Sequence, residues 1–208
     1  PSVMEYLTPT FYFDFESGVI RELFSEFDGK TRTDKEKAIG MYLRIRDGWR
    51  YDPYGISLTP DNYRASTIAQ KSTGNCFEKS ILLITCLRGL GIPARLHLAK
   101  VRNHIAVERL TEKFGTNELT PHGMVDILVN GKWLKVAPAF NASLCRKFNV
   151  PPLEFDSENN SFLQQYNSEG SLFMEYIDDY GHFEDVPLKF MIQNIKDHYP
   201  HIFDRDES

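Results

Sequence analysis

The stretch that decides the fold is GNCFEKSILLITCLRGLGIP, residues 74–93. Its apolar residues fall nearly all round a helical wheel, a distribution typical of a helix that is buried on every side. Gly91 followed by Pro93 ends such a helix, and the loop residues Gly74 and Asn75 place its start at Cys76. The stretch therefore predicts a central core helix over about residues 76–90, with a cysteine at its first position.

Two helices are predicted upstream of the core helix. Ser17 can cap a short helix that Asp28-Gly29 ends. The Thr33-x-x-Glu36 pattern is a capping box, and the apolar residues after it recur at spacings of three and four up to about Gly48. Both patterns indicate helices that place an apolar face against the core.

The segments on either side of the core helix are less regular. Residues 50–75 are rich in Tyr, Pro, Ser, Thr and Asp, which predicts loops with one short helix over about 65–69. After the core helix, residues 94–101 have the length and alternation of a strand, and residues 102–121 are predicted to form a long loop. The chain would therefore enter its next strand only near residue 122.

A β-hairpin follows this loop. Apolar and polar residues alternate over 124–129, Asn130-Gly131 is the dipeptide favoured in a two-residue type I′ turn, and the alternation returns over 132–137. The turn pairs Val129 with Lys132, and continued pairing would place His122 opposite Ala139. An orienting residue for His122 is therefore expected at position 137 or 139, and both positions are alanine.

The remaining sequence completes one predicted domain of α+β class over residues 1–208. Its core covers about residues 30–140, and residues 141–208 form a C-terminal extension. In the extension we expect a strand near 183–186 and a helix that carries Leu188, Met191 and Ile195.

Composition excludes several classes of function. The 208 residues include 24 Lys and Arg against 29 Asp and Glu, a net charge of −5 without any basic cluster, so nucleic acid is not an expected partner. No run approaches the roughly 18 apolar residues of a membrane span, so no membrane partner is expected. Three cysteines without a CxxC pair argue against disulfides and zinc and favour a reduced, cytoplasmic setting. The oligomeric state is unknown from the sequence.

Cys76 and His122 are the candidate catalytic pair. A helix N-terminus favours a thiolate at Cys76, and a histidine on a rigid strand can accept the thiol proton and return it to a leaving group. Taken alone, each residue type at such a position is more often structural. Asn141 is the nearest polar candidate to orient the imidazole, although a turn residue after Pro138 is the commoner role. Asp126 lies on the same strand face, but roughly 13 Å away.

The sequence resembles the transglutaminase-like superfamily in three runs, and the resemblance covers about residues 30–140. The runs are Gly74-Asn75-Cys76-Phe77-Glu78-Lys79-Ser80, Leu90-Gly91-Ile92-Pro93-Ala94-Arg95, and His122 followed by Asn130-Gly131-Lys132-Trp133. Residues 45–47 and 51–52 look like those of bacterial members.

The resemblance implies a papain-like core, in which a cysteine at the start of a central helix packs on an antiparallel sheet. It makes Cys76 the nucleophile and His122 the base. The aspartate of the family, expected in a Trp-x-x-x-Asp-Pro run, is replaced by Ala137. A cysteine nucleophile depends less on this group than a serine does, and Asn141 or an acid of the extension such as Asp185 could complete the site in its place.

These observations predict a cysteine enzyme that acts on a peptide, protein or small amide. Cys76 would form a thioester, His122 would act as acid and base, and water or a second amine would release the acyl group. The resemblance favours water, and hence a protease or amidase. A binding module that has lost turnover is the alternative, motivated by Ala137, and acyl transfer between small molecules would require a pocket for the acyl donor.

No cofactor or metal is predicted for this chemistry. No phosphate-binding glycine loop and no acidic loop with calcium-ligand spacing is present. His97 and His104 lack neighbouring Cys or acidic ligands at metal spacing.

Overall fold

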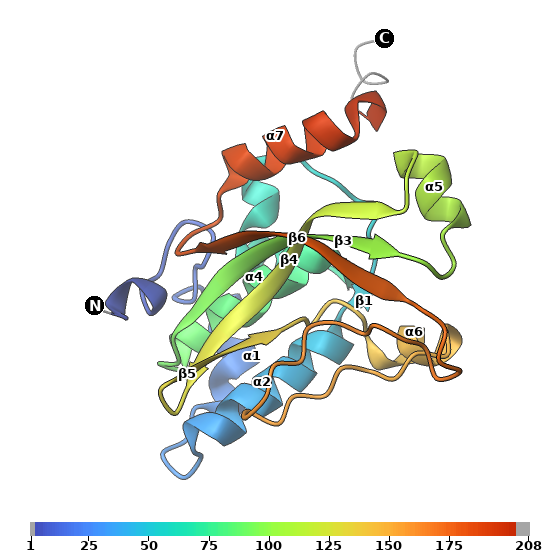
Figure 1. Ribbon diagram of the computed structural model, residues 1–208. Coiled ribbons are helices and arrows are strands. Elements are labelled where there is room, and N and C mark those ends of the chain that lie inside the picture. The colour runs from blue at the N-terminus through green and yellow to red at the C-terminus, as the bar shows by residue number, and fades with distance from the viewer. Residues whose placement is uncertain (1–2, 203–208) are drawn as a thin grey trace.

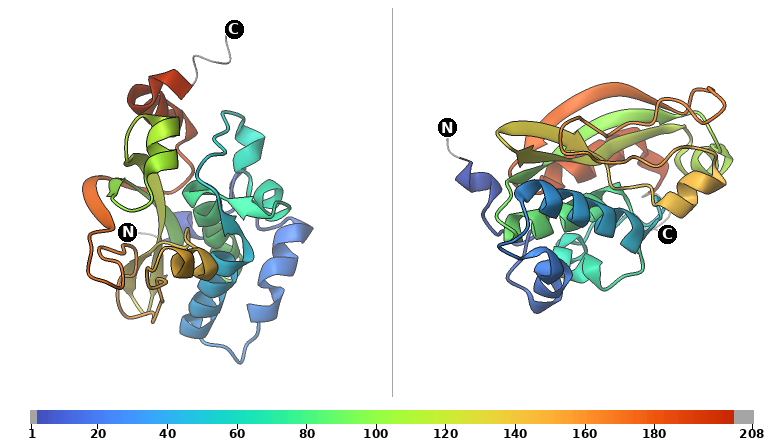
Figure 2. Two further views of the ribbon diagram at one scale, coloured as in Figure 1. Left: turned by 90° about the vertical axis from the view of Figure 1, so that its right-hand side faces the viewer. Right: turned by 90° about the horizontal axis from the view of Figure 1, so that it is seen from below.

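Four antiparallel strands form the main sheet of the protein, and most of the helices lie on one of its faces (Figure 1). The computed structural model describes residues 3–202. Figure 2, in its right panel, shows the sheet as one layer and the helices as a second layer beneath it. The strand order is β5-β4-β3-β6, with β3 Ala94–Asn103, β4 Glu118–Val129, β5 Lys132–Val136 and β6 Met174–Phe183.

Helix α4, Cys76–Gly89, lies at the centre of the helical layer. Leu82, Leu83 and Leu87 on α4 are fully buried and belong to the same core cluster as Val125 and Ile127 on β4. Helices α1 Gly18–Phe24, α2 Asp34–Gly48 and α3 Ala65–Ala69 surround α4, and the short parallel strands β1 Arg50–Tyr51 and β2 Thr73–Gly74 lead to its N-terminus. The remaining helices are α5 Glu108–Phe114, α6 Ala142–Lys147 and α7 Leu188–His198, with 3-10 turns at Met4–Tyr6, Ser25–Phe27, Pro60–Tyr63 and Pro200–Ile202.

The predicted α+β class, with a buried helix packed on an antiparallel sheet, is confirmed. The Thr33 capping box closes the start of α2, with both reciprocal hydrogen bonds to Glu36. The hairpin register is also as predicted, because Val129 pairs with Lys132 through a turn in which both loop residues have positive φ, 52° at Asn130 and 77° at Gly131. The hairpin pairing ends at Val125 and Val136, so the predicted pairing of His122 with Ala139 is not formed. On the other side of β4, His122 pairs with Ala99 of β3.

Two predictions for the segments around the hairpin are wrong. Residues 102–121 are not one long loop, because they contain α5 and the first residues of β4, which begins at Glu118. The strand expected near 183–186 is β6, which spans Met174–Phe183 and pairs with β3 as the edge of the sheet. Both errors lie where exposed polar residues interrupt the apolar pattern on which the predictions rested.

The C-terminal extension covers both sides of the sheet near its centre. Residues between α6 and β6 lie over the outer face, where Leu153 and Phe162 pack on Ala99, Met124 and Ala137. Helix α7 lies beside β4, and the hydroxyl of Tyr199 accepts from Thr120 N and donates to Glu118 O.

That residues 1–208 form one domain stays a prediction. Within residues 3–202, no helix is long and apolar enough to cross a membrane.

Candidate active site

Cys76 is the first residue of α4, and a complete capping box fixes its position. Oδ1 of Asn75 accepts from the backbone N–H of Glu78, and Oε1 of Glu78 accepts from Asn75 N. Glu78 is itself buried and ion-paired with Lys71. The cap pairs with the N–H of Glu78 and not with those of Cys76 and Phe77. These two N–H groups stay at the start of the helix, so the positive end of the helix dipole lies at the sulfur.

Gly123 of β4 brings the sheet into contact with Cys76. The backbone N–H of Gly123 donates to Sγ of Cys76 at 3.3 Å. A Cβ at position 123 would lie 3.3 Å from the carbonyl oxygen of Cys76 and 3.3 Å from Cα of Phe77, so glycine permits this close approach without displacing either strand or helix. Sequence reasoning missed Gly123, although a glycine inside a strand pattern signals a close backbone approach.

His122 precedes Gly123 and lines the same cavity as Cys76. This cavity has a volume of about 50 Å³, and Ile195 and Tyr199 from the region of α7 form part of its wall. His122 is 3% exposed and Cys76 is 8% exposed. The structure therefore brings the two predicted catalytic residues together in one small cavity, where the start of α4 meets the inner strand β4.

Burial keeps both groups neutral at rest. It raises the pKa of Cys76 to about 11, against an opposing effect of the N–H groups of Gly123 and Phe77, which favour the thiolate. Burial also lowers the pKa of His122 to about 4. Because a neutral thiol then lies beside a neutral imidazole, proton transfer would have to accompany attack on a substrate.

Ala137 leaves the imidazole without an orienting partner. Nδ1 of His122 is buried and has no hydrogen-bond partner among the described residues. Ala137 packs with Ala99 and Met124 in a small apolar cluster. A void of about 10 Å³ next to His122 is lined by Ala137 and by Gln164 of the extension. The position expected to hold an aspartate therefore lines the same void as His122.

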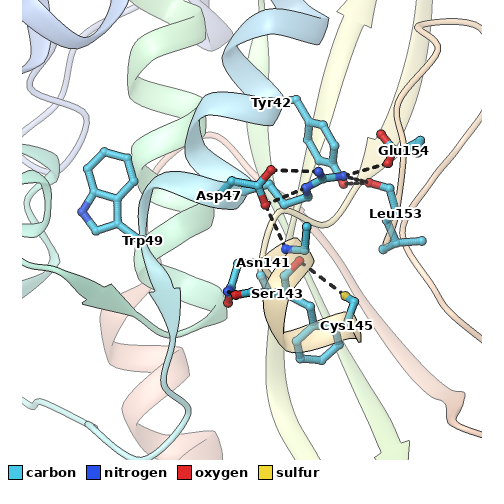
Figure 3. Close-up of polar contacts among 12 residues, drawn as sticks. Tyr42, Asp47, Trp49, Asn141, Ser143, Cys145, Leu153 and Glu154 are labelled. Carbon is cyan, nitrogen blue, oxygen red and sulfur yellow. Dashed lines mark hydrogen bonds and ion pairs between the residues drawn. The ribbon is translucent and has the colours of Figure 1, made fainter. Parts of the chain in front are cut away.

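Asn141 lies at the start of α6, where its carboxamide has other partners (Figure 3). Its Oδ1 accepts from Tyr51 N at 3.0 Å, and its Nδ2 donates to Ser143 Oγ at 2.7 Å. Nearby, Asp47 accepts from Ala142 N and pairs with Arg46. Asn141 therefore joins β1 to α6 in this structure and makes no bond to Nδ1 of His122.

Asp185, the acid offered as a substitute, and Asp126, set aside because of its distance, also lie elsewhere. Asp185 accepts from Thr10 Oγ1 at 2.8 Å. Asp126 accepts from Arg95 at 2.9 Å and lies 3.1 Å from Nδ1 of His97, whose Nε2 contacts Asp179. His97 is therefore held between two carboxylates on the outer face of the sheet.

Across residues 3–202, no group of three or more His, Cys, Asp or Glu side chains is arranged to hold a metal ion.

Lys79 supports the site from within the core. It lies one helical turn after Cys76, is fully buried, and donates to the carbonyl groups of Arg46 at 2.7 Å, Trp49 at 2.7 Å and Ala139 at 2.8 Å. These carbonyls belong to the end of α2, the residue after it and the segment after β5. One side chain therefore ties three parts of the chain to the start of α4.

A family model of the transglutaminase-like superfamily matches residues 21–138. The chain belongs to this superfamily. The matched residues contain Cys76 at the start of α4, His122 on β4 and Ala137 directly after β5. For the superfamily as a whole, a cysteine-dependent enzyme is the function that this membership supports.

A solved structure shares the fold of this transglutaminase-like chain. A proposed cysteine protease from Cytophaga hutchinsonii superimposes with a TM-score of 0.50 at 13% identity, covering 84% of this chain and 63% of that one. A proposed protease from Parabacteroides distasonis has a TM-score of 0.40 and 18% identity, covering 67% of this chain and 30% of that one. The chain thus spans under two thirds of the length of both proteins. No curated protein matched its sequence.

Proposed function

We propose that the protein is a cysteine-dependent amide hydrolase that forms a thioester at Cys76. The observation that carries the proposal is the position of the sulfur, at the N-terminus of a buried helix, 3.3 Å from the N–H of Gly123, and in one cavity with His122. Superfamily membership is the second support. The substrate is a peptide, a protein or a small amide.

The reaction follows the chemistry of an activated thiol. As Sγ of Cys76 attacks the carbonyl carbon, the imidazole of His122 takes the thiol proton, and the N–H of Cys76 faces the developing oxyanion. The imidazole then gives the proton to the leaving nitrogen, and the C–N bond breaks. Water attacks the thioester, its proton passes through His122, and the acid and free thiol are released. A second amine in place of water would give acyl transfer.

A binding module is the second candidate, and the surroundings of His122 favour it. Ala137 supplies no carboxylate, and Nδ1 has no partner to select a tautomer. In such a module the cleft would hold a ligand without turnover, and Cys76 would react as an ordinary buried thiol.

Acylation of the sulfur distinguishes the two candidates. We would mix the protein with 4-nitrophenyl hexanoate, follow nitrophenolate release, and locate the acylated peptide by mass spectrometry. The enzyme predicts a burst equal to the protein concentration and a thioester at Cys76. His122→Ala should slow acylation by about 100-fold or more, whereas Cys145→Ser serves as the matched thiol control.

The fate of the thioester distinguishes hydrolysis from transfer. Decay in buffer alone indicates hydrolysis, and decay that accelerates with added methylamine indicates acyl transfer. Acylation of Cys76 at the same rate in wild type and His122→Ala would contradict the enzyme and favour the binding module.

A further inference from the structure

A second and larger cavity adjoins the Cys76 cavity. Its volume is about 310 Å³, and three residues, Tyr51, Pro53 and Leu119, line both spaces. The left panel of Figure 2 faces this side of the molecule, with α5 above and α6 below. Because the two spaces share a wall, a group held in the larger cavity lies next to the region in which Sγ is placed.

The lining of the larger cavity is mostly apolar. The segment after β3 and α5 contribute Ile105 and Leu110, α6 contributes Leu144, and Phe140 and Phe173 close the inner side. Pockets of small ligands start at about 300 Å³. The cavity therefore has room for a small ligand group.

The charges of this lining have one sign. Arg109 on α5 and Lys147 on α6 are its cationic residues, both are exposed, and no Asp or Glu lines the cavity. The Arg109 guanidinium lies 4.0 Å from the ring centroid of Tyr54. Within the described part of the chain, neither cation forms an ion pair. Two uncompensated cations at an apolar cavity suit a ligand that carries a carboxylate.

We propose that this cavity binds the acyl part of the substrate, and that this part is a small apolar group bearing a carboxylate. The inference rests on the proposed function, since it assigns the substrate class of that site. It supplies the acyl pocket that the sequence alone could not reveal. A cationic acyl group would meet two like charges, and a large polar one would leave its hydrogen-bonding groups unpaired against the apolar wall.

The test measures binding without turnover. In Cys76→Ala, isothermal titration compares 4-phenylbutanoate with its neutral isostere 4-phenylbutanamide at pH 7.5. We expect the carboxylate to bind about tenfold or more tightly than the amide. Arg109→Gln and Lys147→Gln should each reduce the difference, while Arg146→Gln, which removes the same charge one residue from Lys147 and outside the lining, should preserve it. Leu144→Trp should abolish binding of both probes.

A second measurement tests whether the cavity serves the reaction site. In wild type, saturating 4-phenylbutanoate should slow alkylation of Cys76 by iodoacetamide severalfold. Equal affinity for the two probes, or no binding by a folded Cys76→Ala protein, would overturn the proposal. Binding without protection of Cys76 would overturn it too. Binding and protection in a wild-type protein that is acylated neither by 4-nitrophenyl hexanoate nor by the mono-4-nitrophenyl ester of hexanedioate, whose acyl chain carries a carboxylate, would support the pocket and contradict the hydrolase.

Discussion

The backbone N–H of Gly123 donates a hydrogen bond to Sγ of Cys76 across 3.3 Å. This contact couples the sheet to the nucleophile, because Gly123 follows His122 on β4 and Cys76 begins α4. Burial raises the pKa of the Cys76 thiol, and the hydrogen bond from the N–H of Gly123 acts in the opposite direction and lowers it. The distance between β4 and the start of α4 therefore governs both the position of the sulfur and its acidity.

Gly123→Ala should disturb this contact. A Cβ at position 123 would lie 3.1 Å from Cδ1 of Phe77 and 3.3 Å from two backbone atoms of α4, so the strand has to move away. We expect a loss of about 1–3 kcal/mol in the free energy of unfolding and slower acylation of Cys76. Urea denaturation and the nitrophenyl ester burst measure the two effects. An alanine variant with an unchanged burst would show that the contact is dispensable. The control is Gly18→Ala at the start of α1, where an added Cβ would meet no atom within 4 Å.

The sequence was sufficient for the elements that position the two catalytic candidates. The apolar residues of α4 fall nearly all round the helix and require burial on every side, and the Asn130-Gly131 turn fixes the hairpin register. The capping box at Thr33 is a local pattern, so it too is readable without tertiary structure. These features depend on neighbouring residues, which is why they were predicted.

Features that depend on contacts between distant segments were not predictable. β6 is an edge strand with Glu175, Asp178 and His182 along its length, so no apolar alternation marks it. The roles of Gly123 and of the extension at the site arise only when β4 packs against α4 and α7 packs against β4. For α5, by contrast, a signal was present, because Leu110 and Phe114 are four residues apart and Gly115 has the left-handed φ of 75° that ends a helix.

Lys79→Met should destabilise the fold. The substitution preserves the length of the side chain but leaves the carbonyl groups of Arg46, Trp49 and Ala139 buried without this donor. We expect a loss of about 3 kcal/mol or more in the free energy of unfolding. Lys35→Met, which removes an exposed ion pair with Glu158, should cost less than about 1 kcal/mol. Equal losses in urea denaturation would show that the buried bonds of Lys79 contribute no more than a surface pair.

Acid should destabilise the protein through His122. Its pKa is lowered from 6.5 to about 4 by burial, so the unfolded chain binds more protons than the folded one between these values. The free energy of unfolding therefore falls as the pH decreases through this window. From pH 7.5 to 4.5 we expect His122 to account for a loss of about 2–3 kcal/mol. Urea denaturation at the two pH values measures this loss in the free energy of unfolding, and His122→Gln should lack the part that comes from His122. An identical loss in wild type and variant would mean that the imidazole is not buried in its neutral form.

Ala137→Asp should restore an acidic partner for the imidazole. Position 137 and His122 line the same small void, and Nδ1 has no other partner in the described structure. A carboxylate there would raise the pKa of His122 and, through the imidazolium, lower that of Cys76. We expect alkylation of Cys76 by iodoacetamide at pH 6 to accelerate about tenfold or more, at a cost of about 1–3 kcal/mol in the free energy of unfolding, because the apolar cluster of Ala99 and Met124 receives a polar group. Ala137→Asn is the matched neutral variant. If it accelerates alkylation as much as Ala137→Asp does, charge is not the cause, and if neither variant does, position 137 does not act on the imidazole.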